Sequence, residues 1–167
     1  RRVLFRSNGV KIAIGRAGNV IGGGDWSRDR LIPDLIKSIN SKETLMIRSP
    51  KATRPWQHVL DPLYGYLKLC AELDNDYSLH GEAFNFGPLN QESRSVESIC
   101  YQVKDIFPEV KFEINDVENP ESNLLQLDCA KSLITLGFSA RFDSYEAVKM
   151  TINWYKQYMK DKTKLKF

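Results

Sequence analysis

Short apolar segments typical of β-strands alternate with amphipathic segments typical of α-helices along nearly the whole chain of 167 residues. The strand-like segments cover residues 10–15, 44–48, 82–86 and 110–114. Strands separated by helices are typical of α/β folds, in which at least some strands pair in parallel. With 42% apolar residues and no internal repeat, the chain is expected to bury a core as one large domain or as a lobe and a half.

Apolar spacing and boundary residues predict where the helices lie. One helix is expected after residue 30, and a second is expected to begin at Asp61 as its N-cap, followed by Pro62. Three more are expected to begin at the caps Ser95, Asp128 and Ser144. The residues predicted to face the core are Ile32, Leu35, Ile36 and Ile39; Leu63, Tyr66, Leu67, Cys70 and Leu73; Val96, Ile99, Cys100, Val103 and Ile106; and Val148, Ile152, Tyr155 and Met159.

The composition limits the classes of partner. The 24 basic and 21 acidic residues give a net charge of +3, a near balance that argues against a nucleic-acid-binding surface. No apolar run approaches the roughly 20 residues that a membrane span needs, and no signal peptide opens the chain. The three cysteines are far apart and only two histidines occur, which argues against a metal site. We therefore expect a soluble, reduced, cytoplasmic protein without nucleic acid, membrane or metal as a partner.

The chain starts without Met, and its first seven residues, RRVLFRS, lead into an Asn-Gly turn. We interpret the chain as a fragment of a longer protein. Residues 1–9 are then a lead that is foreign to the fold or disordered, residues 10–160 fold, and residues 161–167 form a basic tail.

The most informative segment is the loop Arg16–Arg30, which carries four glycines directly before a predicted helix. Glycines let the backbone approach a ligand closely, and the N-terminus of a helix attracts anions. The loop matches neither the Walker pattern nor G-x-G-x-x-G. It is therefore either an anion-binding loop or an irregular turn, in which Asn19 would satisfy its own backbone.

Basic residues gather in this loop and the next one. They are Arg28, Arg30, Arg48, Lys51 and Arg54. A diphosphate needs two or three such donors, and arginine is favoured because it can make bidentate contacts. Each of them can equally be a solvated surface charge. His58, which lies close to Arg54, is interpreted as a packed or hydrogen-bonded structural residue.

Five blocks of sequence, in order and spacing, resemble the CDP-glucose 4,6-dehydratases of the extended short-chain dehydrogenases. They are RAGNVIGGGDW (16–26), RLIPDLI (30–36), IRSPKATRPWQHVLDPLYGYL (47–67), EAFNFGP (82–88) and LDCAKSL (127–133). The resemblance runs from about Val10 to Tyr158. It implies that residues 10–160 are the C-terminal part of an NAD-dependent epimerase/dehydratase domain. That part comprises late strands of a Rossmann-like sheet and a small mixed α/β lobe that binds the nucleotide sugar.

The resemblance also implies an activity. Transient reduction of NAD by the sugar, loss of water across C5 and C6, and return of the hydride to C6 would convert CDP-glucose to CDP-4-keto-6-deoxyglucose. A homodimer and a role in the synthesis of lipopolysaccharide O-antigen are implied for the complete enzyme.

Residue roles follow from the matching blocks. Asn19 would contact the substrate phosphates, and Arg54 would pair with the diphosphate, with Arg48 as a weaker candidate. The nucleotide pocket would be lined by Arg30, Leu31, Ile32 and Pro33. The strand end near the nicotinamide would be formed by Arg16, Ala17 and Gly18.

The departures from the family pattern matter as much as the matches. The glycine-rich dinucleotide fingerprint and the Tyr-x-x-x-Lys catalytic pair are absent from this chain, as are the threonine and acidic residues that manage the dehydration. The fragment alone is therefore expected to be inactive. Pro120-Glu121-Ser122 stands where such proteins commonly carry His-Glu. Two alternatives stay open: another nucleotide-sugar epimerase or dehydratase acting on a TDP- or GDP-sugar, and a noncatalytic domain that binds nucleotide sugars or a partner protein.

Overall fold

The computed structural model describes residues 9–41, 43–88, 93–115 and 127–164. The strands are β1 (Ile14–Ala17), β2 (Val20–Ile21), β3 (Leu45–Ile47), β4 (Thr53–Arg54), β5 (Gln57–His58), β6 (Ala83–Phe86), β7 (Arg94–Ser95) and β8 (Phe112–Ile114). The helices are α2 (Leu31–Ser41), α3 (Leu60–Asn75), the 3-10 turn η1 (Tyr77–Leu79), α4 (Val96–Ile106), α5 (Ala130–Leu136) and α6 (Ser144–Lys164).

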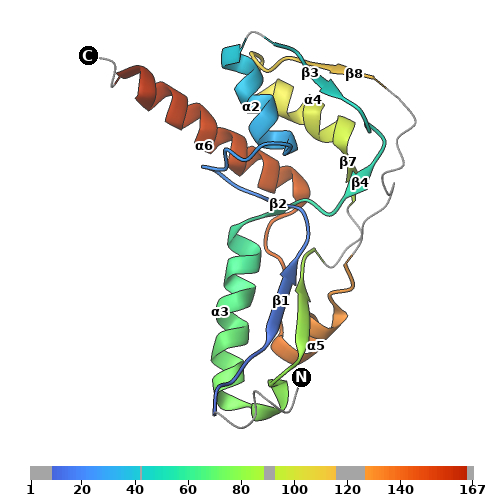
Figure 1. Ribbon diagram of the computed structural model, residues 1–167, viewed down its shortest axis with the longest axis vertical. Coiled ribbons are helices and arrows are strands. Elements are labelled where there is room, and N and C mark those ends of the chain that lie inside the picture. Colours follow the sequence, from blue (N-terminus) through green and yellow to red (C-terminus); the bar gives the residue numbers. More distant parts are fainter. Residues whose placement is uncertain (1–8, 42, 89–92, 116–126, 165–167) are drawn as a thin grey trace.

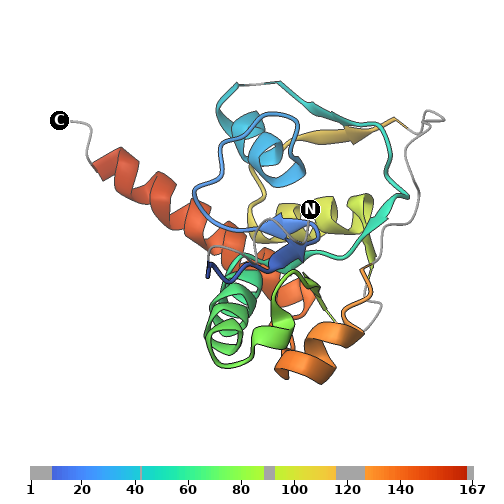
Figure 2. The ribbon, with the colours of Figure 1, turned by 60° about the horizontal axis from the view of Figure 1, so that its bottom comes forward.

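The predicted α/β class with parallel pairing is confirmed. The strands form two-stranded pairs, of which β1–β6, β2–β5 and β3–β8 are parallel and β4–β7 is antiparallel. Figure 1 shows β1 and β6 with α3 and α5 in one half of the molecule, and α2, α4, β3 and β8 in the other, beside the first half of α6. In both views the C-terminal turns of α6 project away from the rest (Figure 2).

The half that contains β1 and β6 has its own core. Phe86 of β6 is fully buried and packs edge-on against Phe138, with ring centroids 4.9 Å apart, and against Tyr66 at 5.4 Å. Gly65 of α3 lies so close to Phe86 that a Cβ there would overlap its ring. The helix therefore lies directly on β6.

The other half surrounds a larger apolar cluster. Its fully buried members from the helices are Leu35, Ile36, Ile99, Cys100, Val103, Ala147, Val148, Ile152 and Tyr155. Burial raises the pKa of the Cys100 thiol to about 12, so this thiol stays protonated in the core. The apolar spacings predicted for the first, third and last helices thus face one another across a shared core.

The buried face predicted for α3 is partly wrong. Leu67 is 72% exposed, and Leu63 and Cys70 are exposed too, whereas Leu69 and Leu73 are buried. The contact between Gly65 and Phe86 rotates the helix so that the line through Gly65 and Leu69 faces the sheet. A pattern read from apolar side chains does not count glycine, which is why the sequence suggested a different face.

The predicted caps of α3 and α6 are also wrong. The N-cap of α3 is Val59, without a capping side chain, because the buried Asp61 instead accepts hydrogen bonds from the backbone N–H groups of Arg141 at 2.9 Å and Phe142 at 3.4 Å. At α6 the capping side chain is Asp143, whose Oδ1 accepts from the N–H of Glu146 at 2.7 Å. Glu146 in turn accepts from the N–H of Asp143, so the two form a capping box.

Other predicted boundaries agree with the structure. Ser95 caps α4 by accepting the N–H of Ser98 at 3.2 Å, and Gly137 ends α5 in the left-handed conformation at φ 59°. The predicted cap Asp128 of α5, in contrast, is wrong: the N-cap is Cys129, without a capping side chain, and Asp128 precedes it, where its Oδ1 accepts the N–H of Ala130 at 2.9 Å.

The first strand is displaced from its predicted position. It begins at Ile14, and it is exposed along most of its length. The N–H of Ile12 instead donates to Nδ1 of His80, and its oxygen accepts from the N–H of Gly81. These two bonds hold the segment predicted as the start of the strand against the turn after η1.

Two of the sequence predictions concern residues outside the described ranges. Residues 1–8 and the segment Pro120-Glu121-Ser122 lie outside them. At the other end, α6 continues to Lys164, into the segment predicted as a basic tail.

Candidate functional site

A cavity of about 910 Å³ opens where β1, the start of α2 and β4 meet. This is within the range of about 300–1,000 Å³ that is typical of small-molecule sites. Its lining residues are Ala17, Gly18, Asn19, Val20, Ile21, Gly22, Asp25, Arg28, Asp29, Arg30, Leu31, Ile32, Pro33, Arg54, Trp56, Tyr66 and Val96. Residues of β1, β2 and β4, of the loops next to these strands and of the helices α2, α3 and α4 contribute, so the cavity exists only in the folded chain.

The turn between β1 and β2 carries Asn19 into this lining. Its backbone oxygen accepts the N–H of Gln57 at 3.1 Å, and the N–H of Val59 donates to the oxygen of Ile21 at 2.8 Å. These bonds flank the parallel pair of β2 and β5. The pairing places Asn19 beside the segment that contains Arg54.

The glycines after β2 have packing roles that the sequence did not reveal. A Cβ on Gly22 would lie 2.7 Å from Cγ1 of Val59, and one on Gly23 would overlap the indole of Trp154. Gly24 has φ +80°, a conformation that favours glycine. The glycines at 23 and 24 thus serve helix contact and chain reversal, while Gly22 also lines the cavity.

Charges of both signs line the cavity. Arg28, Arg30 and Arg54 contribute guanidinium groups, and Asp25 and Asp29 contribute carboxylates. Hydrogen bonds from Ser27 lower the pKa of Asp25, and the nearby charge of Arg30 lowers it further. Asp29 has φ 58°, a conformation that aspartate tolerates better than most residues.

Arg54 and Trp56 are held by the antiparallel pair of β4 and β7. Arg54 faces Arg94 in the register, is half-buried, and donates from Nη1 to the backbone oxygen of Thr53 at 2.9 Å. Trp56 is buried, and its Nε1 donates to the backbone oxygen of Arg94 at 3.1 Å. Arg94 itself contacts Gln102 of α4. The part of the cavity lining next to β4 is therefore connected to α4 through Arg94.

The structure brings most of the predicted site residues together. Those that line the cavity are Ala17, Gly18, Asn19, Arg30, Leu31, Ile32, Pro33 and Arg54. Arg16 and Arg48 are exposed and are not part of the lining. Arg16 precedes Ala17 on β1, and successive residues of a strand point to opposite faces. Arg48 directly follows β3, which pairs with β8 in another part of the fold.

Sequence reasoning missed several lining residues. Tyr66 was predicted to face the core, because helical spacing does not distinguish a core position from one that lines a cavity. Val96 reaches the cavity because β7 pairs with β4, a long-range contact without a local signal. Asp25 and Asp29 lie in the glycine-rich loop itself, and their acidic side chains are not part of the basic pattern that predicts a diphosphate site.

Other candidates fall outside the cavity. His58 is buried, accepts the N–H of Leu60 on Nδ1 at 3.4 Å, and packs edge-on against Phe142. Burial lowers its pKa. These contacts agree with a structural histidine. Among the described residues, no group of three His, Cys, Asp or Glu could hold a metal ion. No helix within the same residues is long and apolar enough to span a membrane.

Comparison with known proteins gives a family match. The sequence model of the NAD dependent epimerase/dehydratase family matches residues 2–87. A CDP-glucose 4,6-dehydratase from Salmonella typhimurium (strain LT2) is 37% identical over 158 residues, which cover 93% of this chain and 44% of the relative. The chain therefore spans less than half the length of this curated relative.

Solved structures show the same fold. A UDP-glucuronic acid 4-epimerase from Bacillus cereus, in complex with UDP-glucuronic acid and NAD, matches with a TM-score of 0.74 and 20% identity over 94% of this chain and 49% of its own. A dTDP-glucose 4,6-dehydratase from Streptomyces venezuelae, with NAD and TYD bound, matches with a TM-score of 0.75 and 19% identity over 93% and 47%. An epimerase from Methanothermobacter thermautotrophicus reaches 0.79 at 17% identity, over 98% and 48%.

Proposed function

Because the chain belongs to the NAD dependent epimerase/dehydratase family, we propose that it is the nucleotide-sugar-binding part of a CDP-glucose 4,6-dehydratase. The observation that carries the proposal is that Asn19, the segment 30–33 and Arg54, which lie far apart in the sequence, line one cavity. The 37% identity to the Salmonella enzyme supports the choice of CDP-glucose over other nucleotide sugars.

The cavity offers the groups that a nucleotide diphosphate sugar requires. Three arginines, Arg28, Arg30 and Arg54, can neutralise a diphosphate, and the guanidinium fork suits two phosphate oxygens at once. Apolar side chains of segment 31–33 and Val96 provide a surface for the base. The carboxylates of Asp25 and Asp29 can accept hydrogen bonds from sugar hydroxyl groups.

The chain contributes only part of what NAD would need. The carboxyl ends of parallel strands are where nucleotides bind in α/β folds, and Ala17 ends β1 at the cavity, directly before Gly18. Ala17 and Gly18 are half-buried there and Arg16 is exposed beside them, so a cofactor can approach the end of β1. Bound NAD would take up hydride from the sugar and return it. The residues of this chain bind the nucleotide and orient the sugar, so the 167 residues alone are expected to be inactive.

Calorimetric titration tests the proposal. The purified chain, shown to unfold cooperatively on heating, is titrated with CDP-glucose, dTDP-glucose, GDP-mannose and UDP-glucose. We expect CDP-glucose to bind most tightly. A clear preference for another nucleotide would keep the nucleotide-sugar site but replace the substrate, and no binding of any nucleotide sugar would reject the proposed function.

An activity assay complements the titration. The complete gene product, incubated with NAD and CDP-glucose, should release a 4-keto-6-deoxy sugar nucleotide. Formation of a C4 epimer instead would indicate an epimerase. The solved epimerases have the same fold at about 20% identity, so fold likeness alone does not separate these two reactions.

A further inference from the structure

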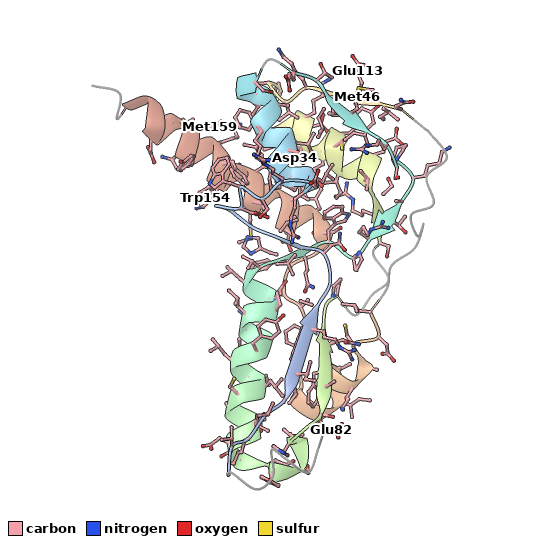
Figure 3. The ribbon with its side chains drawn as sticks, in the orientation of Figure 1. Asp34, Met46, Glu82, Glu113, Trp154 and Met159 are labelled. Carbon is pink, nitrogen blue, oxygen red and sulfur yellow. The ribbon has the colours of Figure 1, made fainter. Side chains whose placement is uncertain are left out.

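An aromatic cluster joins the C-terminal helix to the loop after β2. Trp26 of the loop packs edge-on against Tyr155 of α6, with ring centroids 5.3 Å apart, and lies 5.4 Å from Tyr158. Trp154 stacks on Tyr158 at 5.3 Å and packs edge-on against Tyr155 at 5.2 Å. Figure 3 shows Trp154 on α6 beside this loop. Four rings thus connect two segments that are far apart in the sequence.

The backbone of the loop follows the same surface. Gly23 lies against the indole of Trp154 so closely that a Cβ would overlap it. Its φ is not in the left-handed region, so packing against Trp154, and not backbone conformation, accounts for glycine at this position. The phenol of Tyr155 donates to the backbone oxygen of Asp25 at 2.5 Å. The loop is therefore fixed to α6 at three successive points, Gly23, Asp25 and Trp26.

These three residues are close in sequence to the charged residues of the loop that line the cavity. Asp25 lines the cavity itself, and Arg28, Asp29 and Arg30 follow within the same loop. Trp154 does not line the cavity. Any effect of Trp154 on a bound ligand must therefore pass through the loop.

We propose that Trp154 is a positioning residue that holds loop 22–30 in the conformation in which its charged side chains face the ligand. The inference rests on the proposed function only for the identity of that ligand. Trp154 is 43% exposed, and its neighbour Trp26 is 42% exposed. Exposed rings contribute less to core burial than buried ones, so removing the indole should disturb the loop more than the fold as a whole.

Two measurements on the purified chain test this role. Hydrogen exchange reports the opening of residues 22–30 without any ligand, and calorimetry reports the affinity for CDP. In Trp154→Ala we expect faster amide exchange in this loop and affinity for CDP weakened about tenfold, because a displaced loop no longer presents its charges to the ligand. Trp154→Phe keeps a ring to stack on Tyr158 and should recover most of the affinity. Tyr145→Ala is the matched control, since Tyr145 is a 54% exposed aromatic residue near the start of the same helix.

A second variant tests the contact itself. Gly23→Ala should mimic Trp154→Ala, because its methyl group must displace the indole. In the double variant, where the indole is gone, the added methyl should cost no further affinity. Additive losses would contradict a shared contact.

The outcomes separate this inference from the proposed function. Loop exchange that stays at the wild-type rate in Trp154→Ala overturns the positioning role. So does a lower melting temperature with unchanged loop exchange and CDP affinity, which would mark Trp154 as purely structural. If the wild type does not bind CDP, the proposed function fails, while loop exchange still decides the role of Trp154.

Discussion

The backbone N–H of Gln57 donates a hydrogen bond to the backbone oxygen of Asn19 over 3.1 Å. Next to it, Val20 pairs with Gln57 in the parallel pair of β2 and β5. The main chain of Asn19 is therefore fixed independently of its side chain. This separation allows the side chain to be tested for ligand binding without disturbing the turn.

Asn19→Ala should weaken CDP-glucose binding about 10- to 150-fold, the loss expected for one hydrogen bond to a charged phosphate. The free energy of unfolding should change by less than about 0.5 kcal/mol, because the backbone bonds stay in place. Calorimetry and urea unfolding of the same preparation measure both quantities. Lost stability with intact binding would instead identify Asn19 as a turn residue only.

Asp61→Ala should destabilise the chain by about 2–4 kcal/mol, because the buried carboxylate accepts the N–H groups of Arg141 and Phe142. Asp61→Asn keeps one acceptor oxygen and should recover part of the loss. Asp105→Ala, at an exposed position of α4, is the control and should stay within about 0.5 kcal/mol of the wild type. Urea unfolding that finds Asp61→Ala as stable as this control would contradict the assigned role.

Stability should also depend on pH through His58. Burial lowers the pKa of His58 below its ordinary value of 6.5, against the raising effect of Asp61. Between the folded pKa and 6.5 the unfolded chain holds the proton and the folded chain does not, so stability falls as pH falls through this window. His58→Asn removes the titrating group and should flatten this slope when melting temperatures are compared from about pH 7.5 to about pH 5.5. Asp105→Ala, which keeps His58, should retain the wild-type slope, and identical slopes in His58→Asn and the wild type would exclude His58 as its source.

The sequence predicted those parts of the fold that depend on local signals. Ser95 and Gly137 mark the start of α4 and the end of α5 because their capping chemistry involves neighbouring residues only. The face of α3 was not predictable in the same way. It depends on the contact of Gly65 with Phe86, which belongs to a strand later in the sequence.

In the candidate site, too, local signals were predictable and long-range contacts were not. The loop that carries Asn19 and Arg30 could be selected from its glycines and its charges. Val96 enters the cavity through the pairing of β4 with β7, and no local pattern announces that pairing. Trp154 reaches the site only through the loop, by its contact with Gly23 and by the rings of α6 that hold Trp26, so its role could be inferred only after the fold was known.

Arg54 lines the cavity and is half-buried at the end of β4. We expect its guanidinium group to make a charge-assisted, bidentate bond to the diphosphate. Such bonds contribute roughly 1.5 to 3 kcal/mol. Arg54→Ala should therefore weaken CDP binding by about 10- to 150-fold. Arg54→Lys keeps the charge without the planar fork and should recover only part of the affinity.

Arg48 provides the matched control for this experiment, because it is an exposed arginine nearby in the sequence that does not line the cavity. Arg48→Ala should leave the affinity for CDP within about fivefold of the wild type, since exposed charges contribute about 1 kcal/mol at most. Calorimetric titration of CDP into the wild type and the three variants decides the matter. Equal dissociation constants for the wild type and Arg54→Ala would remove Arg54 from the site. Equal losses in Arg48→Ala and Arg54→Ala would mean that general positive charge, and not a specific contact in the cavity, attracts the nucleotide.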